Sequence, residues 1–198
     1  GGEVTEVTGD IPTKDQVNAM SSKQIVENIK VGWNLGNSLD SHDTNSSDTE
    51  TGWGNPKTTQ QMIDTVKAAG FNAVRIPVTW GEHMAADGTI DAAWMSRVKE
   101  VVDYAYNDGL YVILNVHHDD ELWLVPTKDK LESDKATLTT IWKQICATFQ
   151  DYDHRLIFEG MNEPRVIGSA EEWTGGTQES YDVINQLFQA VSYTHLRA

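Results

Sequence analysis

Cysteine is nearly absent from this sequence, as are most features that build redox, nucleic-acid or membrane sites. A single cysteine, Cys146, occurs among 198 residues, so no internal disulfide can form, and its apolar helical surroundings favour a buried thiol. Only 15 Lys and Arg stand against 30 Asp and Glu, for a formal charge of −15. Because no basic patch is present, we expect no nucleic-acid partner and a neutral or basic substrate.

Long apolar runs are also missing. No stretch is long enough to cross a bilayer and no signal-peptide core is visible, so we expect no membrane span. The chain begins at Gly1 without a methionine, which a processed or cropped N-terminus would also give. With 198 residues it is short for the roughly 250 residues of a complete eight-stranded α/β barrel.

Short apolar runs alternate with helical patterns along most of the chain. Residues 1–20 begin with a polar stretch without periodicity and are predicted to be a linker or arm. Four runs then have the pattern of strands, and their starts lie roughly 40 residues apart, as repeated βα units require. These runs are residues 31–35, 73–77, 111–116 and 156–159. We therefore predict an α/β fold with four parallel strands.

Capping residues and apolar stripes mark the helices. Ser21 with Gln24 and Thr58 with Gln61 have the spacing of capping boxes, and Asp91 is placed to cap a later helix. Three helices are expected to bury residues at helical spacing. These residues are Trp94, Val98, Val101, Val102 and Ala105, then Leu138, Ile141, Trp142, Ile145 and Phe149, and finally Tyr181, Ile184, Leu187 and Phe188.

Polar residues follow each strand-like run, which is where parallel sheets keep their chemistry. LIFEGMNEP ends in Asn162, Glu163 and Pro164. Because a residue before proline favours extended geometry, Glu163 should continue the strand direction and point from the rim. For an isolated Glu-Pro pair a loop cap is the simpler interpretation. Polar residues at three other strand ends favour a functional site instead.

An arginine and two histidines add to this pattern. Arg75 lies inside the otherwise apolar VRIPVTW, and a buried guanidinium requires an anionic partner, so we predict a carboxylate nearby. His117 and His118 follow the third run, where imidazoles can ligate metal, tune an acid or hold hydroxyl groups. Adjacent residues of a strand point to opposite sides, which favours separate roles over joint ligation of one ion.

The combination of GWNLGNSLD, WGNP, GFNAVRIPVTW, VILNVHHD and LIFEGMNEP resembles glycoside hydrolase family 5, most of all its subfamily 4 endoglucanases. The resemblance covers residues 25–190, with the motifs in the family's order. It implies a (β/α)8 TIM barrel, here truncated to about the first four βα units, with residues 21–191 as the N-terminal half of the catalytic domain. It also implies hydrolysis of β-1,4-linked glycans with retention of configuration, without cofactor or metal.

Carried over residue by residue, the resemblance implies a role for each motif residue. Glu163 matches the general acid/base, and Asn162 matches the amide that binds the substrate's 2-hydroxyl. Arg75 matches the arginine that supports the nucleophile, and His117 matches a histidine that lines the cleft. The expected substrate-binding residues are Asn37, His118, Trp53 and Trp123, with packing as the alternative role for each tryptophan besides stacking on a sugar ring. We expect partial burial and a partner carboxylate to raise the pKa of Glu163, which must stay protonated until it acts.

The sequence departs from the family in two places. The family's nucleophilic glutamate belongs to later strands, and Glu171, Glu172 and Glu179 follow the fourth run too soon and are interpreted as solvated or helix-capping charges. Residues 192–198, SYTHLRA, do not continue the expected helix and are predicted to be a non-native tail. We therefore expect that the chain alone hydrolyses no polysaccharide. Its parent is expected to be an extracellular or cell-surface, monomeric enzyme acting on β-glucan.

Several alternatives stay open at this stage. The parent's preference among xyloglucan, mixed-linkage glucan, xylan and mannan depends on loops and on strands that are not present. A chain that binds carbohydrate through Trp53 and Trp123 without hydrolysing it is a second possibility. A structural fragment with neither property is a third.

Overall fold

Four parallel strands lie at the centre of the structure, a computed structural model that describes residues 11–195. The strands are β1 (Gly32–Asn34), β2 (Ala73–Ile76), β3 (Tyr111–Asn115) and β4 (Leu156–Glu159), and they pair in this order. All three pairings are parallel. Each strand lies within a run predicted from the sequence, and the predicted α/β fold is confirmed.

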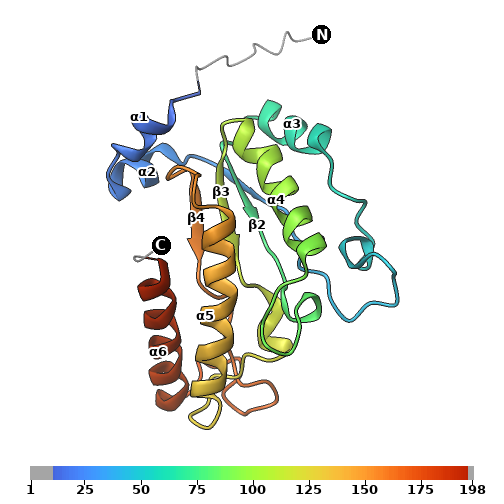
Figure 1. Ribbon diagram of the computed structural model, residues 1–198, viewed down its shortest axis with the longest axis vertical. Coiled ribbons are helices and arrows are strands. Elements are labelled where there is room, and N and C mark those ends of the chain that lie inside the picture. The colour runs from blue at the N-terminus through green and yellow to red at the C-terminus, as the bar shows by residue number, and fades with distance from the viewer. Residues whose placement is uncertain (1–10, 196–198) are drawn as a thin grey trace.

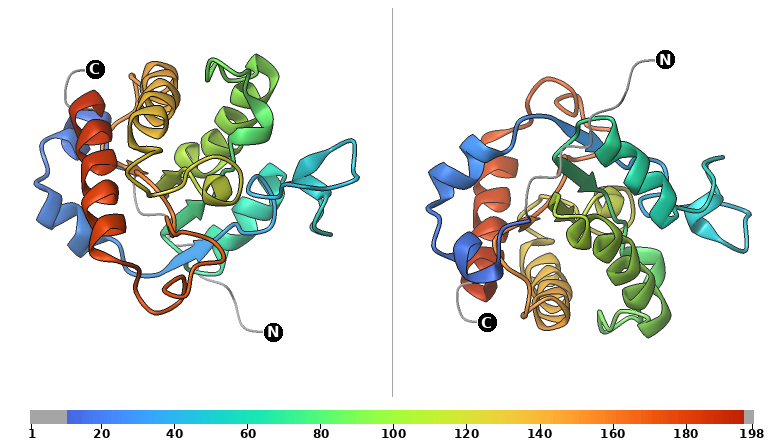
Figure 2. Two further views of the ribbon diagram at one scale, coloured as in Figure 1. Left: turned by 90° about the horizontal axis from the view of Figure 1, so that it is seen from below. Right: turned by 90° about the horizontal axis from the view of Figure 1, so that it is seen from above.

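Helices follow the strands and cover one side of the sheet (Figure 1). The α-helices of residues 11–195 are α1 (Lys14–Asn18), α2 (Ser22–Asn28), α3 (Gln60–Ala68), α4 (Ala92–Asn107), α5 (Leu131–Thr148) and α6 (Gln178–His195). Short 3₁₀ helices are η1 (Thr49–Thr51), η2 (Gly81–His83) and η3 (His118–Glu121). In the views from below and above, α3 to α6 lie around the outside of the curved sheet (Figure 2). None of the helices in this part of the chain is long and apolar enough to span a membrane.

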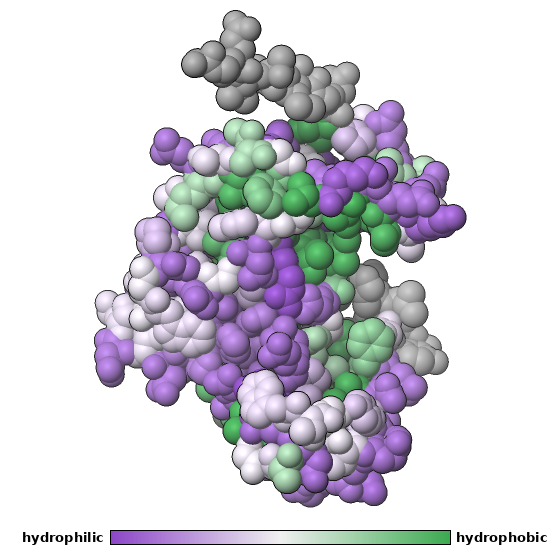
Figure 3. Space-filling model, turned by 180° about the vertical axis from the view of Figure 1, so that it is seen from behind, coloured by the Kyte–Doolittle hydropathy of each residue, from purple (hydrophilic) through white to green (hydrophobic). Residues whose placement is uncertain are grey.

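The two faces of the sheet differ in burial. The side chains that face the helices, Val74, Ile76, Val112 and Leu114, are fully buried. The alternating residues of the same strands, such as Arg75 and Ile113, lie on the inner face and are only half-buried. On the side opposite to Figure 1, apolar residues gather in the upper half and polar residues dominate the lower half, where the strands end (Figure 3). Because the strands are parallel, their C-terminal ends lie together, and the polar residues that follow them gather at this end of the inner face.

The apolar stripes of α4 and α5 are buried as predicted. The stripe of α6 is rotated from its predicted position. Val183, Leu187 and Val191 are its buried apolar residues up to position 192, whereas Tyr181 and Phe188 are 49% and 54% exposed. The helix packs on α5, whereas the Phe188 ring lies near Gly160 and the Tyr181 hydroxyl lies near Gly175.

The ends of the chain and two helix starts also differ from the predictions. The predicted arm contains α1, because Thr13 and Gln16 form a reciprocal capping box and Val17 is fully buried. Thr59 rather than Thr58 caps α3, and Asp91 stands before α4 without a side-chain capping bond. The helix α6 continues to His195, into the predicted tail. Residues 1–10 of the arm and 196–198 of the tail lie outside the described residues.

Candidate active site

A hydrogen-bonded cluster centred on Arg75 lies on the inner face of the sheet. Its Nε and Nη2 atoms donate to the two carboxylate oxygens of Glu159 at 2.7 and 2.5 Å. The same guanidinium donates to Oδ1 of Asn162 at 2.9 Å and to Oδ1 of Asn34 at 3.1 Å. Glu159 is therefore the carboxylate that the guanidinium requires. The pKa of Arg75 is raised, first by the hydrogen bonds to Glu159 and more weakly by the charges of Asp40 and Glu163.

Asn115 connects this cluster to His117. Its Nδ2 donates to Oε1 of Glu159 at 3.1 Å and lies 2.9 Å from Nδ1 of His117. Burial, and then the charge of the neighbouring His118, lower the pKa of His117 to about 4. The His117 imidazole is therefore neutral near pH 7, so that Nδ1 accepts from Asn115 and the proton resides on Nε2.

Replacing Glu159 by glutamine tests the Arg75 cluster. Burial works to raise the pKa of Glu159, but the hydrogen bonds from Arg75 and Asn115 outweigh it and hold the pKa below its ordinary 4.5. We expect Glu159→Gln to lower the free energy of unfolding by about 1–3 kcal/mol near pH 7, because Arg75 loses its anionic partner.

The pH dependence of this loss follows from the lowered pKa of Glu159. A carboxylate with a depressed folded-state pKa stabilises the fold above its unfolded-state pKa, and that contribution is lost as the pH falls through the folded-state value. The difference between wild type and Glu159→Gln should therefore shrink below pH 4.5. Urea unfolding of both proteins at neutral and acidic pH measures this, and an equal difference at both pH values would contradict it.

We predicted that the rings of His117 and His118 point to opposite sides, but in the structure they lie next to each other. Their centroids are 4.5 Å apart, because β3 ends at Asn115 and the alternation of a strand no longer applies. Their partners nevertheless differ. Nε2 of His118 lies 3.7 Å from Oδ2 of Asp40, and Nδ1 lies 3.6 Å from Oε1 of Glu121. The nearby Asp40 carboxylate favours the protonated imidazole and raises the pKa of His118.

Glu163 follows this cluster in the loop after β4, with a backbone that differs from the prediction. Its φ angle is 40°, in the left-handed region and not in the extended one. Its side chain is 67% exposed, and its carboxylate lies 4.0 Å from Nη1 of Arg165. The predictions of extended geometry and partial burial are therefore wrong for this structure. The left-handed φ of Glu163 turns the chain one residue after the backbone N–H of Asn162, which donates to the carbonyl of Val116 at 2.9 Å.

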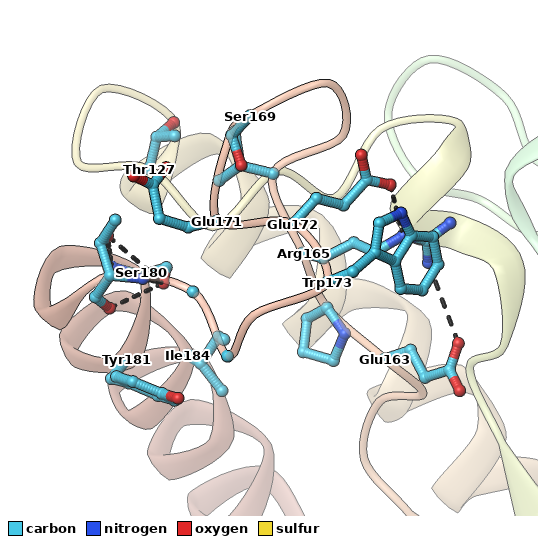
Figure 4. A pocket seen from close by; sticks show the side chains of 15 residues that line it. Thr127, Glu163, Arg165, Ser169, Glu171, Glu172, Trp173, Ser180, Tyr181 and Ile184 are labelled. Atoms are coloured by element: carbon cyan, nitrogen blue, oxygen red, sulfur yellow. Dashed lines mark hydrogen bonds and ion pairs between the residues drawn. The ribbon is translucent and has the colours of Figure 1, made fainter.

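Arg165 holds the loop that carries Glu163. It pairs with Asp120, with Glu121 at 3.2 Å and with Glu172 at 3.1 Å, and its guanidinium lies 4.8 Å from the ring centre of Trp173. Glu172 is thus an ion-paired group and not the solvated or helix-capping charge that we predicted. Arg165, Glu172 and Trp173 border a cavity of about 580 Å³ between the loop and the start of α6, and Glu163 lies at one end of it (Figure 4).

The two predicted tryptophan platforms have different surroundings. The Trp53 indole is 39% exposed, donates through Nε1 to the carbonyl of His42 at 3.0 Å, and lies 5.4 Å from the His118 ring. Trp123 is half-buried, and its Nε1 donates to the fully buried carboxylate of Asp119 at 2.7 Å. Asn37 is exposed, with φ at 58°. Of the two tryptophans, Trp53 therefore has the larger exposed surface on which a ligand ring can stack.

Sequence reasoning missed several residues of this site, among them Glu159, Asn115 and Arg165. Register offers a signal for two of them, since Asn115 is paired with Glu159 across β3 and β4. A carboxylate and an amide at the ends of adjacent parallel strands should meet beside the inward-facing Arg75. No comparable signal exists for Arg165, because its partners come from loops.

Comparison with known proteins finds a matching family model and similar proteins of known sequence and structure. The family described as Cellulase (glycosyl hydrolase family 5) matches residues 38–195. Endoglucanase A of Clostridium longisporum is 53% identical over 172 residues, which are 84% of this chain and 33% of that protein. Endoglucanase A of Ruminococcus albus is 47% identical over 182 residues, covering 91% of this chain and 50% of that protein.

Among solved structures, a GH5-4 broad specificity endoglucanase from Ruminococcus champanellensis with bound cellotriose superposes with a TM-score of 0.86. It is 46% identical, and the match covers 90% of this chain and 54% of that one. The chain therefore spans about half the length, or less, of the relatives that it matches. Its four-stranded parallel sheet corresponds to part of a TIM barrel.

Proposed function

Because this chain belongs to glycosyl hydrolase family 5, we propose that its protein is a retaining endo-β-1,4-glucanase in which Glu163 is the general acid/base. One observation carries the assignment of Glu163. It directly follows Asn162 after β4, and the Asn162 side chain is oriented by Arg75. Since Asn162 Oδ1 accepts from Arg75, its NH₂ group is the end that can donate to a substrate hydroxyl. The endoglucanase names of the relatives support the reaction class.

The remaining roles follow from the chemistry of a retaining glycosidase. Such an enzyme needs a second carboxylate about 5–5.5 Å from the acid to attack the anomeric carbon. Glu159 does not suit this role because both of its oxygens are bonded to Arg75. We place the nucleophile in the part of the family fold that this chain does not span. Arg75 would support it there, and the neutral His117 would line the cleft.

A β-glucan is the proposed substrate. The relative with bound cellotriose supports this choice, and the exposed face of Trp53 offers a surface on which a pyranose ring can stack. His118, Asn37 and Trp123 are the other proposed substrate-binding residues. We propose further that the protein acts outside the cell or at its surface, where polymeric glucan is accessible, and that it needs no cofactor.

The stereochemistry of hydrolysis tests the proposed function. The full-length protein is incubated with cellopentaose, and the anomeric composition of fresh products is followed by NMR. Retention predicts that the β-anomer appears first and then mutarotates. The 198-residue chain alone should release no reducing sugar from β-glucan, because it lacks the nucleophile. Initial release of the α-anomer, or hydrolysis by the chain alone, would overturn the proposal.

The choice of polysaccharide is tested separately. Initial rates of the full-length protein are compared on carboxymethylcellulose, xyloglucan, mixed-linkage glucan, xylan and mannan. We expect the highest kcat/KM on a β-1,4-glucan backbone. A higher value on xylan or mannan would reassign the substrate without changing the reaction class.

A further inference from the structure

Two histidines and a glutamate form a second cluster beside the candidate active site. His42 lies in the loop after β1, whereas His118 and Glu121 lie on η3. Nε2 of His42 lies 3.5 Å from Oε2 of Glu121, and Nδ1 of His118 lies 3.6 Å from Oε1 of the same carboxylate. One ligand atom from each residue lies within 4.8 Å of the others. Two imidazoles and a carboxylate form a donor set typical of zinc sites.

The spacing of these atoms fits a cation better than hydrogen bonds. An N–H···O hydrogen bond is about 2.7–3.2 Å long, and both histidine–glutamate separations exceed that range. In a tetrahedral zinc site with bonds of about 2.0–2.1 Å, neighbouring ligand atoms are about 3.3–3.4 Å apart. The observed 3.5 and 3.6 Å are close to this value, and because they end on the two different oxygens of Glu121, they correspond to a carboxylate that binds the ion through both oxygens. A small contraction of the cluster around an ion would complete the geometry.

His42 supplies an independent argument. Its side chain is more than nine-tenths buried, and neither ring nitrogen has a hydrogen-bond partner among the described residues. A buried polar group without a partner is costly, and such groups in native proteins call for an explanation. Its Nε2 atom faces Glu121, so that a bound cation would give this nitrogen a partner.

The surroundings of the cluster resemble the outer shell of a metal site. Ligating histidines commonly direct their second nitrogen to a carboxylate, which fixes the tautomer. Nε2 of His118 faces Oδ2 of Asp40 at 3.7 Å, and Asp40 is itself fixed by the backbone N–H of Ser38 at 2.8 Å. Glu121 is held by Arg165 at 3.2 Å. His118 can therefore keep its proton on Nε2 and leave the lone pair of Nδ1 for a metal.

We propose that His42, His118 and Glu121 bind a divalent cation of the zinc class and link the loop after β1 to η3. The mixed nitrogen and oxygen donors disfavour Ca²⁺ and Mg²⁺, which prefer oxygen ligands alone. A second grouping, Asp40 with His117 and His118, shares one histidine with this set. It is the weaker candidate because Nδ1 of His117 already accepts from Asn115 and one oxygen of Asp40 accepts from Ser38. The proposed site does not depend on the proposed glucanase activity.

Metal titration of the tag-free 198-residue chain tests this proposal. Calorimetry with Zn²⁺ should give one site per chain, and Co²⁺ should give the visible absorption of a tetrahedral complex. His42→Ala and Glu121→Gln should each weaken Zn²⁺ binding at least tenfold, and Asp40→Asn should weaken it about 10–100-fold through the outer shell. Glu121→Gln preserves the side-chain volume, and circular dichroism of each variant verifies that it is folded.

Two controls separate this site from its alternatives. His154 is exposed and outside both groupings, so His154→Ala should leave the affinity unchanged, and a loss there would reveal adventitious surface binding. His117→Ala should also retain binding. A loss in His117→Ala with retention in His42→Ala would move the site to Asp40, His117 and His118. Absence of saturable Zn²⁺ binding by the wild-type chain would overturn the proposal.

Discussion

Glu163→Gln is expected to lower the kcat of the full-length protein on β-glucan by about 10²–10⁴-fold, the contribution typical of a general acid/base. Glutamine keeps the shape of the side chain but cannot protonate the departing glycosidic oxygen. Because the substitution leaves the contacts of Asn162 and Arg75 in place, KM should change little. The loss should then appear in kcat and in kcat/KM alike.

Substrates whose leaving groups differ in acidity test whether Glu163 donates a proton. An aryl cellobioside with an acidic phenol needs little protonation to depart, so Glu163→Gln should lose much less of its glycosylation rate on that substrate than on glucan. Glu27→Gln is the matched control, since Glu27 is an exposed glutamate of α2 whose side chain pairs with Lys23. An unchanged kcat for Glu163→Gln on glucan, or equal losses on both substrates, would remove Glu163 from proton transfer.

The largest expected effect on stability concerns a buried ion pair that is not part of the Arg75 cluster. Glu50 is 1% exposed and receives two hydrogen bonds of 2.8 Å from the Arg97 guanidinium. The backbone N–H of Thr58 donates to the same carboxylate at 2.8 Å. We expect Glu50→Gln to lower the free energy of unfolding by about 3–5 kcal/mol, because removing one partner of a buried ion pair leaves the other charge uncompensated. Since Arg97 keeps its bond to Glu100, the lower end of this range is expected.

An exposed ion pair in the same chain provides the comparison. Lys23 and Glu27 lie 3.8 Å apart in α2, with side chains 85% and 61% exposed. Lys23→Ala should change the free energy of unfolding by no more than about 1 kcal/mol. Urea unfolding of the 198-residue chain measures both variants. A cost of less than about 1 kcal/mol for Glu50→Gln would mean that solvent or Glu100 compensates Arg97 after the substitution.

Periodicity explains why strands and most helices were predictable from the sequence. The runs that form β2, β3 and β4 are apolar on the side that faces the helices. Strands of a parallel sheet covered by helices need apolar side chains there, so that the sequence alone indicates them. The stripes of α4 and α5 are buried for the same reason. For α6 the pattern was ambiguous, since its apolar residues spread over more than one face and tertiary packing selected Val183, Leu187 and Val191.

Site contacts could be predicted where a charged group requires a partner. The direction of a side chain could not be predicted where it depends on the backbone conformation of a loop. A buried guanidinium requires a carboxylate, and Arg75 found one in Glu159. The preference of a pre-proline residue for extended geometry failed at Glu163, whose φ angle of 40° lies in the left-handed region. Likewise, the opposite orientation expected for His117 and His118 assumed a strand that had already ended at Asn115.

The open sheet has a practical consequence. In the described part of the chain, β1 pairs with β2 alone and β4 pairs with β3 alone, so each outer strand presents a free row of backbone donors and acceptors. Each row is available to pair with a further strand, and the closed barrel of the family's solved structures implies such pairing. We therefore expect a polypeptide that carries further strands of this barrel to raise the free energy of unfolding of the chain when the two are mixed.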